Sequence, residues 1–338
     1  MRNPRLKHAA YAAALAAIAR ELPVDPGGGA PNNPGVICLA NETRFIESYF
    51  NEPLTTYAVG WRDPNNIEAT LNFCCPPVPV SRRFTYREWI NKEEFYSETD
   101  DIRAIGSDFK RVEYTGKETE GKTLNKGLTM LVDLDEVADK TNWEQTYVAK
   151  LMRRLFRNEL RRAIGLLDDG TNTAKTWDTT AGKDPDQDVL TDLIAATTAS
   201  GIRPNRVLYG ETAWDKRGLS HRAQTTAGGF ASAAMTPQQV ASILMVDGVM
   251  VSKERYQSDA STKTQILNNL VIEFFQTNGI DLEDPSNVKR FVTPISGAGG
   301  NFRVYTQQIS AKLYVITVEH YSNIVSTSTL GLRKLTIS

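Results

Sequence analysis

Residues 143–167 read WEQTYVAKLMRRLFRNELRRAIGLL and form the most regular stretch of the chain. Apolar side chains recur there every three or four residues, which is the period of an α-helix with one buried face. Just before and within it, Thr141 and Glu144 match a capping box, in which each side chain binds the other residue's backbone. The pattern predicts one amphipathic helix from Asn142 to Leu167, about 39 Å long at 1.5 Å per residue.

The outer face of this helix is basic. It carries Lys150, Arg153, Arg154, Arg157, Arg161 and Arg162 against Glu144 and Glu159. A solvated face held by salt bridges fits this pattern, and so does a surface that faces nucleic acid or an acidic partner. The sequence leaves both interpretations open.

The whole chain has the composition of an ordinary globular protein, with 338 residues, 41% apolar and 23% charged. Lys and Arg (39) nearly balance Asp and Glu (40), so no global field would draw the chain to nucleic acid or to an anionic membrane. Three cysteines, Cys38, Cys74 and Cys75, match neither a disulfide framework nor a zinc pattern and favour a reduced, intracellular chain. No stretch approaches the roughly 20 apolar residues of a membrane span, which predicts no membrane partner.

The segments before the long helix read as an arm and a projecting hairpin. The basic, Ala-rich start up to Ala19 fits an exposed helix or a signal peptide, and the run from Glu21 to Asn41 is rich in Pro and Gly. Residues that interrupt helices and strands continue to Val80, and this pattern predicts an extended arm that lies against another subunit. Residues 82–127 are strand-like but too polar to form a core, which predicts a long β-hairpin.

The rest of the chain mixes strands and helices. Alternation from Leu128 to Leu134 predicts a strand, and a helix near Asp188 precedes the buried strand Arg206–Gly210. A helix follows at 211–219, then an irregular stretch of small residues at 223–234, then a helix with a capping box at Thr236. Strands dominate beyond this point. Because no regular βα repeat is present, the pattern favours an α+β fold.

A search for catalytic and ligand-binding motifs is mostly negative. The chain has three histidines, His8, His221 and His320, and none has a Ser or Cys partner in a known nucleophile motif. Residues 184–188, Asp-Pro-Asp-Gln-Asp, lack the remaining ligands of a calcium loop, and the Gly-rich turn at 297–300 lacks a helix that would bind phosphate. We therefore expect no enzyme activity, no cofactor and no metal.

The order of these features resembles the major capsid proteins of tailed bacteriophages, whose shell fold is shared with encapsulins and the herpesvirus capsid floor. Four stretches carry the resemblance. They are DIRAIGSDFKRV at 101–112 in the hairpin, VDLDEVAD at 132–139 before the helix with its RNELRR core, NRVLYGETAWD at 205–215, and ILMVDGVMV at 243–251. The resemblance covers the chain from about Ala30 onward.

The resemblance implies a domain division and a function. The arm would span 1–80 and the extended loop 81–127; the peripheral domain, with spine helix 142–167, would comprise 128–171 and 296–323, and the axial domain 172–295 and 324–338. Copies would assemble through pentamers and hexamers, in the host cytoplasm, into the icosahedral capsid of a virion that encloses double-stranded DNA. Separate scaffolding, portal or decoration proteins are further expected partners, since no coiled-coil extension precedes the arm.

Two sets of residues are expected to make these contacts. Exposed aromatic and Arg side chains are common interface anchors, which favours Arg83, Phe84, Tyr86 and Trp89 in the loop. Non-specific phosphate contacts are expected from Arg2, Arg5, Lys7, Arg153 and Arg157. Three alternatives stay open: an encapsulin-like shell around protein cargo, a cytosolic hydrolase using Asp184, Asp186, Asp188 or His221, and an adhesion or tail component.

Overall fold

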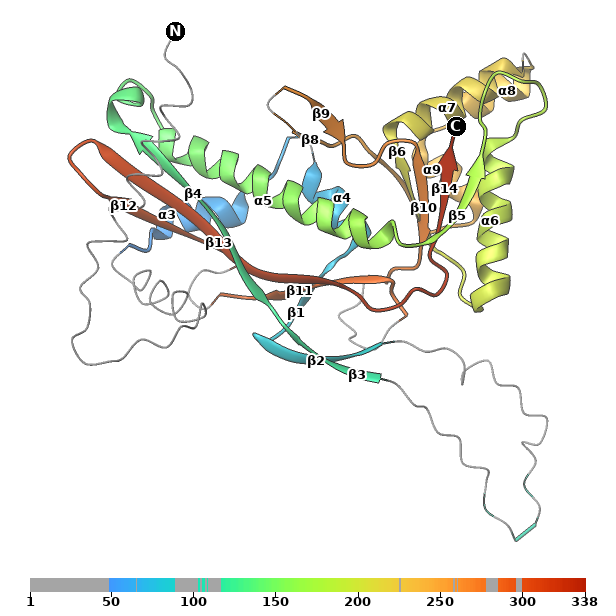
Figure 1. Cartoon of the computed structure of the whole chain (residues 1–338), viewed down its shortest axis with the longest axis horizontal. Helices are drawn as coiled ribbons and strands as arrows, with labels where there is room; N and C mark the ends of the chain where they lie inside the picture. The colour runs from blue at the N-terminus through green and yellow to red at the C-terminus, as the bar shows by residue number, and fades with distance from the viewer. Residues whose placement is uncertain are drawn as a thin grey trace. The chain divides into compact units, whose positions relative to one another are not determined.

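The structure, a computed structural model, describes residues 49–88 and 117–338 apart from 65, 225, 258, 260, 278–284 and 296–299, together with positions 103, 105, 106 and 108. These residues belong to one compact unit, Glu47–Ser338, and the other unit, Met1–Ile46, lies outside them. The helices (Figure 1) are α3 (Glu52–Gly60), α4 (Ile67–Cys74), the 3-10 turn η1 (Leu134–Glu136), α5 (Trp143–Leu167), α6 (Pro185–Ser200), α7 (Glu211–Ala223), α8 (Ala227–Ala233) and α9 (Pro237–Leu244). The strands are β1 (Pro77–Pro79), β2 (Arg83–Glu88), β3 (Lys117–Lys122), β4 (Leu124–Asp133), β5 (Thr171–Lys175), β6 (Arg206–Gly210), β7 (Gly248–Ser252), β8 (Arg255–Gln257), β9 (Lys263–Gln265), β10 (Leu270–Phe274), β11 (Val288–Thr293), β12 (Phe302–Gln308), β13 (Leu313–Ser326) and β14 (Arg333–Ile337).

The first sheet is organised around β13, which is 14 residues long. Its order is β1-β11-β13-β12, and β4 also pairs with β13. The first part of β13 lies between β12 and β4, so that Tyr314 is opposite Gln308 on one side and Val132 on the other. The last part of β13 pairs with β11. The strand expected from the alternation after Leu128 is therefore present as β4.

The second sheet has the order β5-β14-β10-β6-β7. The central strand β10 runs antiparallel to both β14 and β6, whereas β5 and β7 add in parallel at the edges. On one face of this sheet, Val271 and Leu335 join an apolar cluster with residues of α6, α7 and α9. On the other face, Ile272 and Phe274 join the main core with α5. The predicted α+β fold is confirmed.

The helix α5 joins these parts, because its apolar stripe supplies a large share of the main core. Over 25 residues it buries side chains from Val148 to Leu167, packs along β13, and is covered by α3 and α4 (Figure 1). The predicted spine helix is confirmed to within one residue. No helix in the described part of the chain combines the length and apolar character that crossing a membrane requires.

The predicted helix caps have different outcomes. The capping box at Thr236 and Gln239 is present at the start of α9. The box expected from Thr141 and Glu144 is wrong, because Asn142 takes the N-cap position of α5 in a left-handed conformation, φ 56°, and no side chain caps the helix. Stability of this helix start therefore comes from packing of the first turn and not from a cap.

Part of the expected arm belongs to the core. Residues 52–74 form α3 and α4 in place of an extended segment, with Leu54, Ala58, Ile67 and Leu71 buried against α5. Prolines hid these helices in the sequence, because Pro53 occupies the first turn of α3, where a missing N–H costs nothing. The arm expected before residue 49 lies outside the described residues.

Two other segments differ from expectation. The stretch 223–234 contains α8, whose first turn is capped by the Thr226 hydroxyl accepting from Gly229 N. β11 falls in the range expected for the axial domain, yet it pairs with β13 in the first sheet. The division into peripheral and axial domains stays a prediction.

The hairpin expected from residue 82 is represented by β2 and β3, which pair antiparallel from Arg83 opposite Lys122 to Glu88 opposite Lys117. One face of this β2–β3 ladder lies on the body of the protein, where Phe84 and Tyr86 contact Phe291 of β11, with ring centroids 4.3 and 5.6 Å apart. Most of the chain between the two strands, including Trp89, lies outside the described residues.

Two glycines give a matched test of this packing. A Cβ at Gly210, where β6 ends, would lie 1.8 Å from the carbonyl oxygen of Asn268, whereas a Cβ at Gly165 of α5 would meet nothing within 4 Å. We expect Gly210→Ala to lower the free energy of unfolding by about 3 kcal/mol or more. Gly165→Ala should raise it by about 0.5–1 kcal/mol, because alanine favours a helix. Urea unfolding followed by circular dichroism measures both, and equal effects of the two substitutions would contradict the packing of β6.

Candidate functional site

One acidic side chain lies within the apolar stripe of α5. Glu159 occupies a helical position one turn from Phe156 and Ala163, both buried, and is itself only 3% exposed. An ionised carboxylate at such a position is costly unless it is paired and hydrogen-bonded. The residues that pair with this carboxylate therefore define the candidate site.

The first sheet supplies most of those partners. Lys126 Nζ of β4 lies 2.9 Å from Glu159 Oε1, and the Ser322 hydroxyl of β13 donates to Oε2 at 3.0 Å. His320 Nε2, also of β13, lies 3.8 Å from Oε1. The Arg162 guanidinium, half exposed, contacts Oε1 from the next turn of α5. We call Glu159, Lys126, His320, Ser322 and Arg162 the Glu159 cluster.

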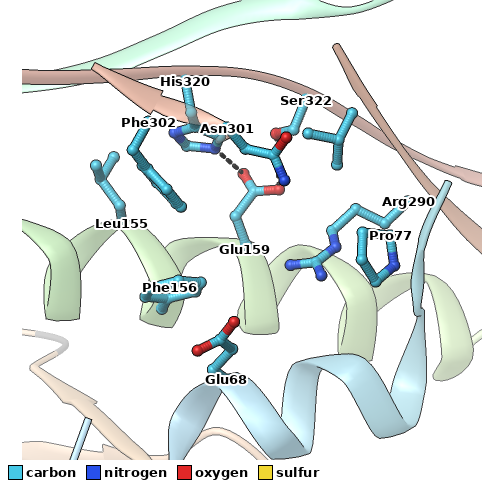
Figure 2. Close-up of a pocket in the computed structure, with 11 residues that line it drawn as sticks. Glu68, Pro77, Leu155, Phe156, Glu159, Arg290, Asn301, Phe302, His320 and Ser322 are labelled. Carbon is cyan, nitrogen blue, oxygen red and sulfur yellow. Dashed lines mark hydrogen bonds and ion pairs between the residues drawn. The ribbon is translucent and has the colours of Figure 1, made fainter. Parts of the chain in front are cut away.

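The sheet register explains why these side chains meet. Residues 320 and 322 project from the same face of β13 because side chains alternate along a strand, and Lys126 is directly opposite His320 in β4. Figure 2 shows Glu159 rising from α5 toward His320 and Ser322, with Phe302 and Phe156 beside it. The cluster thus ties the spine helix to two strands of the sheet.

The pKa shifts in the cluster fit a buried ion pair between Glu159 and Lys126. Burial by itself would raise the pKa of Glu159, but the nearby His320 ring and the charge and hydrogen bond of Lys126 outweigh it and hold the pKa below its usual value. Burial lowers the pKa of His320 in spite of the opposing carboxylate, so His320 is neutral near pH 7. Burial also lowers the pKa of Lys126, against the attraction of Glu159.

The Glu159 carboxylate is engaged in an ion pair. It pairs with Lys126 and accepts from the Ser322 hydroxyl, and among the described residues no group of three or more His, Cys, Asp or Glu is placed to hold a metal ion. The sequence pattern placed Glu159 on the outer, basic face of the helix, which is wrong, because the residue is only 3% exposed. One signal was present, because Glu159 follows Phe156 and precedes Ala163 at the spacing of the buried face. Lys126 was not expected to belong to a site.

The residues proposed for a hydrolase are also engaged in the structure. Asp186 accepts two hydrogen bonds from Arg217, at 2.6 and 2.7 Å, and His221 Nε2 lies 3.2 Å away. All three side chains are buried. Burial opposes ionisation of Asp186, but the hydrogen bonds from His221 and Arg217 lower its pKa. This triad joins α6 to α7 and holds the Asp186 carboxylate between two cationic or hydrogen-bonding side chains.

The two neighbouring acids, Asp184 and Asp188, bind different partners. Asp184 caps α6 by accepting from Gln187 N, and Asp188 binds Lys175 Nζ at 2.8 Å and Trp177 Nε1 at 3.0 Å. The three carboxylates of residues 184–188 therefore do not converge on one point.

The two cysteines at the end of α4 are also unreactive: Cys74 is its last residue and Cys75 follows it. Cys74 and Cys75 are buried, and burial raises the pKa of Cys75 to about 12. A thiol with so high a pKa is not a nucleophile near pH 7, which fits the expected role of packing.

The expected interface anchors in β2 lie on two different faces of the β2–β3 ladder. Arg83 is exposed, but Tyr86 is buried and Phe84 is half-buried against Phe291. The expectation that these two rings are exposed is therefore wrong, because β11 supplies an intramolecular partner. The exposed face of β2 is formed instead by Arg83, Thr85 and Arg87.

The residues expected to face DNA have intramolecular carboxylate partners where they are described. Arg153 Nε lies 3.1 Å from Asp63 Oδ1, and an Arg157 nitrogen lies 3.7 Å from Glu254. Arg2, Arg5 and Lys7 lie outside the described residues. The role of all five in binding DNA stays a prediction.

Comparisons with known proteins place the fold. No family model and no curated protein matches the sequence. The crystal structure of a phage-related protein from Bordetella bronchiseptica RB50 superimposes with a TM-score of 0.61 at 15% identity, over 86% of this chain and 97% of that one. Two weaker likenesses are an encapsulin complex from Synechococcus elongatus PCC 7942 and the mature capsid of bacteriophage PhiM1. The first has a TM-score of 0.47 at 12% identity, over 91% of this chain and 96% of that one. The second has a TM-score of 0.44 at 8% identity, over 79% of this chain and 86% of that one.

The chain therefore has the α+β fold of the phage-related protein, and an identity of 15% shows the fold alone. At TM-scores below 0.5 the other two likenesses carry no argument of their own.

The Glu159 cluster predicts that neutralising Glu159 lowers the free energy of unfolding strongly. Glu159→Gln leaves Lys126 buried without its countercharge, and breaking a buried pair in this way costs about 3–5 kcal/mol of unfolding free energy. The matched control is Glu118→Gln, since Glu118 makes an exposed pair with Arg87, and it should cost less than about 1 kcal/mol. Urea unfolding at neutral pH distinguishes the two, and equal, small effects would show that the cluster is not a lock.

The burial of His320 predicts that the free energy of unfolding decreases as the pH falls. Because its pKa is lower in the folded chain than the ordinary 6.5, the unfolded chain binds the proton first as the pH falls, and stability is lost below about pH 6.5. Between pH 7 and 5.5 the free energy of unfolding should fall by up to about 1 kcal/mol through this group.

The comparison is with His320→Gln, in which that part of the pH dependence should vanish. The ordinary pKa of a Glu, 4.5, lies below this pH range and that of a Lys, 10.5, lies above it, so the proton of His320 dominates the difference between the two proteins. An unchanged pH dependence in the variant would contradict the assignment.

Proposed function

We propose that this chain is the major structural subunit of a phage-type shell, in which copies assemble through pentamers and hexamers into an icosahedral capsid that encloses double-stranded DNA. The observation that carries the proposal is the fold shared with a phage-related protein over 97% of that protein's length. The residues and motifs that resemble tailed-phage major capsid proteins lie along the same chain. A structural role, in the capsid of a virion, accounts for both.

The polar groups of the described residues support a structural role over an enzymatic one. The acids and histidines that a hydrolase would use are engaged in the Glu159 cluster and in the Asp186–Arg217 triad, where they join one element to another. Buried, paired charges hold elements in register and are poorly placed to react with a substrate. We therefore assign them to the rigidity that a shell subunit needs.

The β2–β3 ladder is the surface that we assign to contact with a neighbouring copy. Its inner face is anchored by the Phe84, Tyr86 and Phe291 cluster, so the ladder is held at a defined angle. Its outer face presents Arg83, Thr85 and Arg87 opposite Lys122, Glu120 and Glu118. An exposed ladder with charges of both signs suits a polar interface that forms only with the correct partner.

Assembly of the purified full-length chain tests the proposal. We expect negative-stain microscopy and sedimentation velocity to show closed shells, or rings of five and six subunits. The double variant Arg83→Glu/Arg87→Glu should shift the population toward smaller species, because both charges on the outer face of β2 are reversed. Near-UV circular dichroism should be unchanged, since neither side chain contributes to the apolar core.

A compact monomer of the wild-type chain, also in the presence of scaffolding partners, would contradict the proposed function. Shells of unaltered size in the variant would contradict the assignment of the β2–β3 ladder while leaving the shell itself standing. Shells that hold protein and exclude nucleic acid would favour the encapsulin-like alternative.

A further inference from the structure

One face of α5 is uniformly basic and lies open beside a second basic element. Lys150, Arg154, Arg157 and Arg161 fall within an arc of about 60° at 100° per residue, so they form a single row along the helix. We call this row the basic stripe. Between residues 145 and 167 the one acidic residue of α5 is Glu159, and its carboxylate is buried on another face.

The β8–β9 hairpin lies alongside the basic stripe (Figure 1). The Arg161 guanidinium stacks 3.7 Å above the ring of Tyr256, and an Arg157 nitrogen lies 3.7 Å from Glu254 just before β8. These two contacts fix the hairpin against the helix. The groove between them is lined by Arg157, Lys253, Glu254, Arg255, Tyr256, Gln257 and Lys263.

Several of these cations have no carboxylate partner within the part of the chain that the structure describes. Arg157 pairs with Glu254, and Arg255 contacts Glu211. Arg154, Lys253 and Lys263 are exposed, and no acidic side chain of the described residues lies within ion-pair distance of them. The chain carries a net charge of −1, so this local excess of positive charge is a property of the surface and not of the composition.

We propose that the basic stripe and the β8–β9 hairpin together form a binding surface for the phosphate backbone of double-stranded DNA. The proposal deepens the proposed function, on which it rests, by naming the face of the subunit that meets the genome. Contacts would be independent of sequence, because Lys and Arg side chains in a row pair with phosphate oxygens, and phosphate contacts carry no sequence information.

The dimensions of the surface suit an extended polyanion. From Lys150 to Arg161 the basic stripe is about 17 Å long at 1.5 Å per residue, which matches about five base pairs at 3.4 Å each. A single small phosphate would be held by convergent donors in a closed pocket. Here the donors follow one another along a line.

The chemistry of the groove favours DNA over an acidic protein. Protein interfaces bury an apolar centre with aromatic anchors. The one aromatic side chain that lines this groove, Tyr256, is already covered by Arg161. A partner bound here gains charge neutralisation and little apolar burial, which is the energetic profile of DNA binding by counterion release.

The test compares two triple variants of the full-length, unassembled chain. Arg154→Ala/Lys253→Ala/Lys263→Ala removes three cations of the surface. Lys140→Ala/Arg222→Ala/Lys312→Ala removes one Arg and two Lys that are exposed elsewhere, and Lys312 loses only an exposed pair with Asp135. The two variants therefore have the same net charge.

Binding is measured by fluorescence anisotropy with a labelled duplex of about 30 base pairs, between about 50 and 200 mM salt. We expect the first variant to bind at least about tenfold more weakly at low salt. The slope of log affinity against log salt should fall by about 0.9 for each lost phosphate contact. The control variant should keep the wild-type slope.

Equal slopes for both variants and wild type would overturn the proposal, even if microscopy shows shells, so its failure is distinct from failure of the proposed function. Polyglutamate of matched charge is the second probe. If it binds as tightly as the duplex and loses as much affinity in the first variant, the surface recognises an acidic protein and the DNA proposal is wrong. Loss of DNA binding in the first variant alone would support it, whether or not shells form.

Discussion

The rest of the structure depends on how α5 is held across β13 and β4. The apolar stripe of this helix must be covered on two sides at once, by the first sheet and by α3 and α4. Apolar packing alone would allow the helix to slide by a turn, since similar side chains repeat along it. The pair of Glu159 with Lys126 removes that freedom, because a displaced carboxylate would lose its countercharge inside the core.

A core that is fixed in this way leaves other parts of the chain available for contacts with neighbours. The β2–β3 ladder is anchored on the body of the protein through three aromatic rings, which leaves its other face exposed. The basic side chains of α5 are likewise directed away from the apolar stripe that organises the fold. In the proposed assembly, stability and contacts between copies would therefore draw on opposite faces of the same elements, and charge that is balanced overall is separated locally.

Local patterns predicted the elements that are continuous in sequence. The period of residues 143–167, the alternation in β4 and the capping box at Thr236 were sufficient for α5, β4 and α9. The helices α3 and α4 were missed because they are short and flanked by prolines. The Glu159 cluster was missed because Lys126 and His320 are adjacent only through the register of β4 with β13. For the same reason, the burial of Tyr86 could not be foreseen without its distant partner Phe291.

A cryo-electron microscopy reconstruction of the assembled particle tests the central claim most directly, namely that a rigid body built on α5 presents the β2–β3 ladder to a neighbouring copy. The account predicts a closed shell in which α5 crosses β13 as described and the exposed face of β2 lies against an adjacent subunit. A particle in which that face meets only its own subunit or solvent, or a chain that forms no particle, would contradict it.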